Sequence, residues 1–334
     1  MIGVTTDLPK GRDFPIVVQP RSRRELLDFA EEWSQSLETA VSDHGAVLLR
    51  GFDVPGEAAL SRLFERLWSA PSPYIYRSTP RQAVAPGVYT ATEYPADREI
   101  PLHNENAYQR DWPMRIGFHC VVPAAAGGQT PLADSVKITA RIGTDLVSDF
   151  GRRGVRYIRN YGEAVDLPWQ VVFQTESHEV VETYCAEHDI SFEWIGGDLR
   201  TYQVCQGTAV HPKTGGEIWF NQAHLFHVSA LGQEIAADML AVFGSDGLPR
   251  QAQYGDGAEF ESPVMDHIRD AFAQERVTFD WQAGDILLLD NMRICHGRLP
   301  FAGARRVLVS MGLPRSTLVG SVQTATPAFS RLAD

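Results

Sequence analysis

Two segments that lie far apart in the chain hold residues able to bind one metal ion. His103 and Glu105 are separated by a single residue, and His296 follows much later in the sequence. Side chains two positions apart on an extended strand project from the same face, so His103 and Glu105 are expected to bind one ion while Asn104 points away. Two imidazoles and one carboxylate leave positions open on the opposite side of the ion. This ligand set suits ferrous iron that handles oxygen and a co-substrate, and zinc also accepts it.

A candidate anion-binding pair accompanies these ligands. His296 follows an apolar run at 284–291 that is typical of a buried strand ending at a rim. Arg306 lies ten positions further on, in a strand-like run at 305–311 that is expected to return antiparallel beside the histidine. Its planar guanidinium can bind a carboxylate through two parallel hydrogen bonds, and Thr130 offers a hydroxyl to the same anion. A surface arginine and a turn threonine are the alternative interpretation.

Many short apolar runs bounded by turn residues predict a protein built mainly of strands. Strands are expected at 46–50, 87–93, 116–122, 155–161, 190–194, 200–206, 217–221, 276–280, 285–289 and 305–312. Helices are expected at 24–41, 57–68, 135–150, 176–188, 232–242 and 262–274. This pattern indicates a mainly β fold with flanking helices around a double-sheet jelly roll, also called a double-stranded β-helix. With 334 residues, 44% of them apolar, the chain is long enough for one large core, so a single domain over 1–334 is expected.

Composition excludes several classes of function. The net charge of −12 argues against nucleic-acid binding, because neutralising phosphates requires a basic face. No signal peptide or membrane-spanning run is visible, so no membrane association is expected. The cysteines show no Cys-x-x-Cys pattern and indicate small buried residues in a reducing compartment, which predicts a cytoplasmic protein; they are Cys120, Cys185, Cys205 and Cys295.

These residues together resemble a known family. The chain is similar to the iron(II)/2-oxoglutarate-dependent dioxygenases of the TauD/TfdA superfamily, and within it to the branch of clavaminate synthase and the SyrP-like hydroxylases. That branch carries His-Asn-Glu where taurine dioxygenase has His-x-Asp, and this chain has His103-Asn104-Glu105. The similarity covers most of the chain and includes the segments 45–52, 89–95, 127–134, 154–161, 219–222 and 296–311.

The resemblance implies a role for each candidate residue. It implies that iron(II) is held by His103, Glu105 and His296, and that Thr130 and Arg306 bind the distal carboxylate of the co-substrate 2-oxoglutarate, with dioxygen as the second co-substrate. The adjacent Arg305 competes for the anion-binding role. Arg306 is preferred because strand alternation puts it on one face with Leu308 and Ser310, and because family members place the anchoring arginine second in such a pair.

The segment 150–263 separates the paired ligands from the distal histidine. In the family such an insertion sits over the barrel mouth and helps form the substrate pocket, whereas the alternative is a helical buttress that does not contact substrate. Substrate candidates inside and outside this segment are Glu93, Tyr108, Arg159 and Asn221, with Asn160, Tyr161, Trp169 and His224 as further pocket candidates.

The reaction implied by the resemblance is oxidative decarboxylation of 2-oxoglutarate to succinate, coupled to hydroxylation of an unactivated C–H bond. Its expected substrate is a small molecule, an amino acid either free or tethered to a peptidyl carrier protein, in a specialised pathway such as antibiotic biosynthesis. Glu105 favours hydroxylation over halogenation because related halogenases lack this carboxylate, and the same scaffold can also run desaturation or cyclisation. A zinc-dependent hydrolase would leave Thr130 and Arg306 without a purpose, and the intact ligand set argues against a non-catalytic barrel that binds a small anion.

Overall fold

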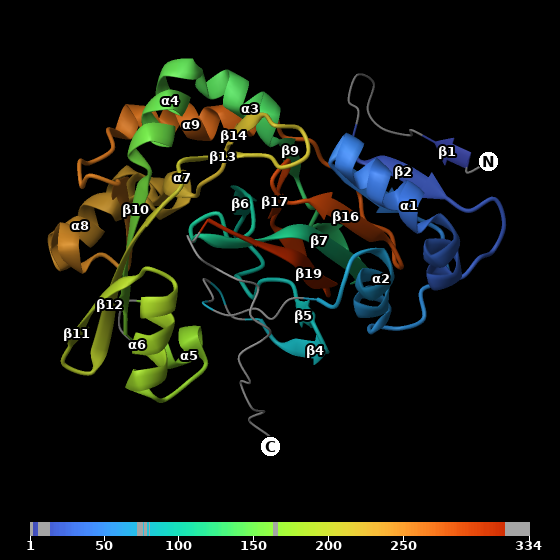
Figure 1. The fold of residues 1–334 in the computed structure, drawn as a ribbon, viewed down its shortest axis with the longest axis horizontal. Helices are drawn as coiled ribbons and strands as arrows, with labels where there is room; N and C mark the ends of the chain where they lie inside the picture. Colours follow the sequence, from blue (N-terminus) through green and yellow to red (C-terminus); the bar gives the residue numbers. More distant parts are fainter. Residues whose placement is uncertain are drawn as a thin grey trace.

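The largest sheet has eight strands, and its central strands form one wall of the candidate site. The computed structural model (Figure 1) describes residues 3–5, 14–71, 76, 79, 81–162 and 166–317. Neighbouring strands of this sheet are antiparallel except β2 and β3. In spatial order the strands are β1 (Gly3–Thr5), β2 (Ile16–Gln19), β3 (Ala46–Leu49), β16 (Ile286–Asp290), β7 (Asp111–Val122), β19 (Arg306–Ser316), β5 (Val88–Thr90) and β4 (Ala83–Ala85).

A smaller three-stranded sheet faces the eight-stranded one. Its order is β6 (Ile100–His103), β17 (Ile294–Arg298) and β9 (Leu132–Asp134). One apolar cluster joins the two sheets, with Leu132 and Ile294 from the small sheet packed among Phe118, Leu289 and Val309 of the large one. Two sheets enclosing a shared core are the arrangement that the sequence predicts.

Two helices cover the other face of the large sheet, as Figure 1 shows. They are α1 (Leu26–His44) and α2 (Ala59–Leu67). Strand β16 is buried on both sides: Leu287 and Leu289 point to the inter-sheet cluster, whereas Ile286 and Leu288 pack beneath the helices. Gly117 of β7 lets α2 approach closely, because a Cβ there would lie 2.5 Å from the Phe64 ring. A strand with two buried faces reads as a continuous apolar run rather than an alternating one.

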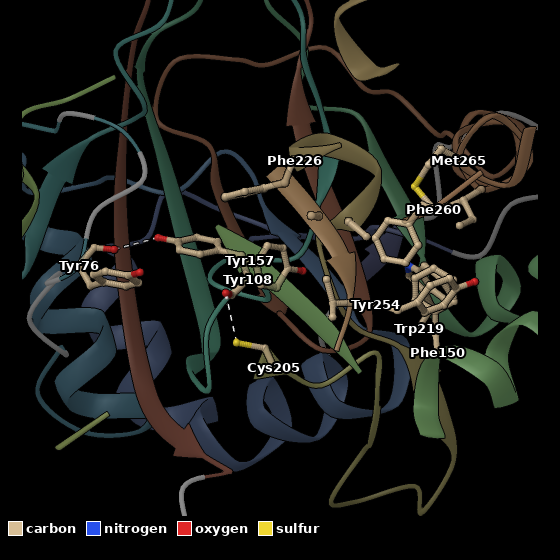
Figure 2. Packing of buried hydrophobic residues seen from close by; sticks show 14 of the residues in the cluster. Tyr76, Tyr108, Phe150, Tyr157, Cys205, Trp219, Phe226, Tyr254, Phe260 and Met265 are labelled. Atoms are coloured by element: carbon tan, nitrogen blue, oxygen red, sulfur yellow. Dashed lines mark hydrogen bonds between the residues drawn. The ribbon is translucent and has the colours of Figure 1, made fainter. Parts of the chain in front are cut away.

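A second body packs beside the two sheets and has its own core. Its four-stranded sheet has the order β11 (Ser191–Ile195), β12 (Asp198–Cys205), β10 (Val155–Tyr161) and β15 (Arg250–Tyr254). Figure 2 shows the aromatic packing of this core, with Phe150, Trp219, Tyr254 and Phe260 clustered at one end. The surrounding elements are α3 (Ser135–Ile142), α4 (Thr144–Arg153), α5 (Trp169–Phe173), α6 (His178–Glu187), α7 (Ala223–Phe226), α8 (Gln233–Gly247) and α9 (Ser262–Gln274).

Small elements complete the described structure. The strands β13 (Thr208–Val210) and β14 (Glu217–Trp219) form a two-stranded ribbon. A second ribbon pairs β8 (Ala126–Gly127) with β18 (Phe301–Ala302). A short 3₁₀ helix, Val228–Leu231, precedes α8.

Two of the predicted elements are wrong. The helix predicted over 135–150 is divided into α3 and α4 at Gly143, whose φ of 90° lies outside the helical region. The strand predicted at 276–280 is absent, because only Val277 pairs with a neighbour. Its backbone N–H and carbonyl both bond to Leu132, and no further residue of the run continues the ladder.

The structure bears on two of the features read from composition. Within the described ranges, no helix combines the length and apolar character needed to cross a membrane. All four cysteines are buried and none is paired with another. Burial raises the pKa of the Cys295 thiol to about 12, so this neighbour of His296 stays a neutral thiol.

A buried charge cluster fastens the end of β16, immediately before the segment that leads to His296. Asp290 is fully buried and accepts hydrogen bonds from Arg115 Nη1 at 2.7 Å and His211 Nε2 at 3.1 Å. Arg115 also donates to Glu38 of α1 at 2.7 Å. Burial would raise the pKa of Asp290, yet the hydrogen bond from His211 and the charge of Arg115 lower it. Arg115 of β7 therefore connects β16 through Asp290 and α1 through Glu38.

We predict that Asp290→Asn lowers the free energy of unfolding by about 3 kcal/mol, because it leaves the buried guanidinium of Arg115 only partly compensated. Urea denaturation followed by tryptophan fluorescence measures this change. The matched control is Asp53→Asn, which removes the exposed ion pair with Arg23 and should leave the urea midpoint unchanged. Equal midpoints for the Asp290→Asn variant and the wild type would contradict this account of the cluster.

Candidate active site

The pairing of β6 with β17 brings the two predicted histidine ligands together. These strands are antiparallel, and their register places His103 directly opposite His296. The two imidazole centroids lie 4.6 Å apart. Gly297 permits this approach, because a Cβ at that position would lie only 2.5 Å from the carbonyl oxygen of Ile100. The prediction that these two distant histidines meet agrees with this geometry.

Glu105 joins them from a turn and not from a strand. Strand β6 ends at His103, so the expected extension of the strand through Glu105 is wrong. Asn291 holds the turn instead: its side chain accepts from the backbone N–H of Glu105 at 2.8 Å and donates to the Glu105 carbonyl at 2.9 Å. Asn104 points away as predicted and donates to the Asn291 carbonyl at 2.6 Å. Hydrogen bonds to Asn291, which is distant in sequence, therefore hold the turn so that the carboxylate lies beside the histidines.

The three side chains fit a divalent metal ion. One potential ligand atom from each lies within 4.8 Å of the other two. His103 Nδ1 is 2.8 Å from the carbonyl oxygen of Pro101. This contact fixes the proton on Nδ1 and leaves the lone pair of Nε2 free to bind a metal ion. Burial, together with the neighbouring His296, lowers the pKa of His103 to about 4, so its imidazole is neutral near pH 7. Two imidazoles and a carboxylate form the ligand set typical of non-haem iron.

The buried carboxylate of Glu105 is ionised. Burial alone would raise its pKa, but the charge of Arg81, together with the nearby His296 and His103, holds the pKa well below its usual value. Arg81 Nη2 lies 3.0 Å from Oε1 and 2.9 Å from Oε2. His296 Nε2 lies 3.6 Å from Oε2.

A pocket between the two sheets opens beside these ligands. Its apolar lining comes from both sheets and consists of Ala91, Ile100, Phe118, Gly297, Val307 and Val309. Its polar lining consists of Arg81, Thr92, His103, Thr130, His296, Arg298 and Arg305. The edge of the Phe118 ring packs against His296 with centroids 5.1 Å apart. The pocket thus combines an apolar lining with cationic groups and the two candidate histidine ligands.

The structure corrects the placement of the predicted anion-binding arginine. Arg306 points out of the pocket and pairs with Glu57 at 2.7 Å, with about half of its side chain exposed. Arg305 lines the pocket instead. Strand β19 pairs with β7 and β5 of the large sheet, so it faces the histidine across the pocket and does not run beside it. The alternation of side chains along β19 was predicted correctly. The face that borders the pocket carries Val307 and Val309, whereas Arg306 lies on the other face.

The pocket presents positive charge that the described residues do not neutralise. Arg305 donates from Nε to the Gly128 carbonyl at 3.1 Å, and Arg298 donates to backbone carbonyls. Neither guanidinium has a carboxylate within ion-pair distance in the described part of the chain. Burial and repulsion from Arg298 lower the pKa of Arg305 to about 10, so it remains charged at neutral pH. Thr130 Oγ1 accepts from Trp281 Nε1 at 3.0 Å, which leaves its own hydrogen available to an anion.

The predicted substrate residues do not line this pocket. Glu93 is exposed, and Asn221 is buried in a turn where it bonds the Gly207 carbonyl and the Ala223 N–H. Tyr108 lies in the core of the second body and donates to the Tyr76 carbonyl (Figure 2).

Arg159 belongs to the same interior and lies over the rings of Tyr76 and Tyr161. Among the described pocket residues none comes from 150–263. That segment instead supports the backbone of the ligand strand: Gln222 donates to the Asn104 carbonyl at 2.7 Å, and His224 lies 3.0 Å from the Leu102 carbonyl. Its described part packs behind the ligand strand, and the role of the insertion in substrate binding stays a prediction.

Three polar residues of the pocket were missed by sequence reasoning. Arg298 lies two positions after His296 on the same strand, so alternation offered a signal for it. Thr92 and Arg81 lie in or beside short strands with no pattern that points to the metal ligands. Only the folded chain brings them into the pocket.

Comparison with curated proteins finds relatives over most of the chain. The dapdiamide synthesis protein DdaC of Enterobacter agglomerans is 42% identical over 276 residues, which cover 82% of this chain and 84% of DdaC. A clavaminate synthase-like protein of Arabidopsis thaliana is 28% identical over 287 residues, which cover 82% of this chain and 83% of that protein.

Solved structures share the fold. An asparagine oxygenase, solved in complex with Fe(II), 3-hydroxyasparagine and succinate, superposes with a TM-score of 0.53 at 12% identity. The superposition covers 86% of this chain and 79% of that structure. The prediction of a mainly β jelly-roll core with flanking helices is confirmed.

A family model identifies the chain. The model described as taurine catabolism dioxygenase TauD, TfdA family matches residues 16–311, which span nearly all of the described structure. The predicted enzyme class, an iron(II)- and 2-oxoglutarate-dependent dioxygenase, is confirmed by this match together with the His-Glu-His group. The chain therefore belongs to the TauD, TfdA family of dioxygenases.

Proposed function

We propose that this dioxygenase hydroxylates an unactivated C–H bond of an amino acid, either free or tethered to a peptidyl carrier protein, in a specialised biosynthetic pathway. The observation that carries the proposal is the juxtaposition of the His-Glu-His group with a cationic pocket between the two sheets. The relative DdaC, which is named for dapdiamide synthesis, supports the assignment to specialised biosynthesis.

In the proposed site, His103, Glu105 and His296 hold iron(II). When bound, the iron supplies the activation of dioxygen that is coupled to oxidative decarboxylation of 2-oxoglutarate. The chain itself keeps the donor atoms ready: the Pro101 carbonyl fixes the His103 tautomer, and Asn291 fixes the turn that carries Glu105.

We assign the distal carboxylate of 2-oxoglutarate to Arg305 and Thr130, in place of the Arg306 of the sequence-based prediction. A partly buried guanidinium without a carboxylate partner favours an anion, and a charge-assisted pair shielded from water is strong. The Thr130 hydroxyl, already oriented by Trp281, adds a neutral donor. Arg298, at the end of β17 in the small sheet, adds a second positive charge to the pocket lining.

The apolar lining of the pocket excludes water from the candidate ligands. Phe118, Val307 and Val309 of the large sheet and Ile100 of the small sheet surround the candidate ligands with hydrocarbon. Exclusion of water strengthens the electrostatic interactions inside the site and keeps solvent away from activated oxygen. The presence of Glu105 as a third protein ligand favours hydroxylation over halogenation.

We also propose a cytoplasmic location. The four buried, unpaired cysteines support it, because a reducing compartment preserves free thiols.

The role of Arg305 predicts how two adjacent substitutions differ. Arg305→Gln should weaken 2-oxoglutarate binding by about 10-fold to 100-fold, since a hydrogen bond to a charged group contributes roughly 1.5–3 kcal/mol. Anaerobic titration of the iron(II)-loaded protein, read from the visible charge-transfer band of the chelate, measures the affinity. Arg306→Gln is the matched control and should leave the affinity unchanged, because Arg306 pairs with Glu57 outside the pocket. The reverse ranking would return the role to Arg306.

The substrate class predicts which compounds stimulate turnover. Succinate release should rise about 10-fold or more above the substrate-free rate with at least one member of two panels, free amino acids or carrier-loaded aminoacyl thioesters. Stimulation by thioesters alone would assign the tethered form, and stimulation by free amino acids alone would assign the free form. Lack of stimulation by either panel, in a protein that shows the charge-transfer band, would eliminate this substrate class while preserving the reaction class.

A further inference from the structure

A single arginine contacts both oxygens of the candidate metal-binding carboxylate. Arg81 Nη2 bridges Oε1 and Oε2 of Glu105 at 3.0 and 2.9 Å, and both side chains are about 95% buried. A carboxylate can bind an ion through one oxygen or through both. An N–H donor on the carboxylate competes for the lone pairs that a second metal bond would use.

The guanidinium is itself held in place from several directions. Arg81 Nη2 lies 3.3 Å from Thr92 Oγ1, just after β5. Its Nη1 lies 3.9 Å from the sulfur of Met311, on the pocket side of β19. Arg81 also lines the pocket with the two histidines. These contacts connect the position of Glu105 to the large sheet, whereas the histidines belong to the small one.

The number of oxygens that Glu105 supplies decides how many positions stay open. A six-coordinate ion bound by two histidines and one carboxylate oxygen keeps about three positions, against about two when both oxygens bind. A chelating co-substrate and dioxygen together require about three. Chelation by both oxygens of Glu105 would therefore block one reactant.

On the basis of the function proposed above, we propose that Arg81 is a positioning residue. Its Nη2, nearly equidistant from the two oxygens of Glu105, occupies the side from which both oxygens could chelate, so that the carboxylate presents a single oxygen to the metal. Arg81 contacts the ligand and not the metal, so it acts through Glu105. Its ion pair with Glu105 also supplies positive charge to a buried carboxylate, which a neutral side chain would not do.

Water-proton relaxation of the full-length protein saturated with Mn(II), without 2-oxoglutarate, tests the proposal, because the enhancement follows the number of metal-bound waters. Arg81→Met should reduce the enhancement by about one third, since about two waters would replace about three. Arg81→Lys keeps a cationic donor and should behave like the wild type. Arg81→Gln, whose side chain is too short to reach Glu105, should behave like Arg81→Met and serves if that variant does not fold.

Arg306→Gln is the control for loss of an arginine beside the site and should leave the enhancement unchanged. An unchanged enhancement in Arg81→Met, or in Arg81→Gln if Arg81→Met does not fold, would overturn the proposal, as would an equal fall in Arg306→Gln. The measurement requires neither iron nor 2-oxoglutarate. Failure of the proposed function would appear separately, as the absence of the charge-transfer band in the wild-type protein.

Discussion

The buried negative charge of Glu105 is the constraint on which the site depends. A carboxylate removed from water is unstable unless positive charge and hydrogen bonds surround it. Here Arg81 supplies the charge, and His103 and His296 approach from the paired strands. Asn291 bonds to the backbone N–H and carbonyl of Glu105 and so holds the turn that places the Glu105 side chain beside the histidines. Three separate parts of the chain are thus held around one ionised group.

The packing of the two sheets forms a pocket beside this group. Both histidines belong to the small sheet, whereas Arg305, Val307 and the Phe118 ring belong to the facing large sheet or its edge. The space between the sheets is enclosed by hydrocarbon and carries cations at defined positions. An anion entering it meets guanidinium groups that no described carboxylate neutralises, and this excess of positive charge matches the co-substrate of the family.

The second body supports the backbone around the ligand strand more than it lines the pocket. Gln222 and His224 bond to the backbone carbonyls that flank the ligand strand β6. The aromatic core around Tyr108 makes this support rigid, because a close-packed interior has low compressibility. The segment therefore stabilises the ligand geometry from behind, and its candidate residues Arg159 and Asn221 are interior residues.

Several features follow from the sequence alone. The types and spacing of His103, Glu105 and His296 determined the ligand set, and the run of short apolar segments determined a mainly β fold, because local patterns carry this information. Tertiary structure decided which arginine faces the pocket. Both faces of β19 are buried, with Val307 on one side and Leu308 on the other. Because the strand has no polar face, its alternation does not show which face borders the pocket.

The contact between Arg81 and Glu105 also belongs to the folded chain. These residues are 24 positions apart in sequence and lie near different sheets, and no periodic pattern connects them. The sequence by itself therefore determined which chemical groups are available and the elements that carry them. Only the packing of one sheet against the other decided which of those groups meet, because distances between strands of different sheets depend on the whole core.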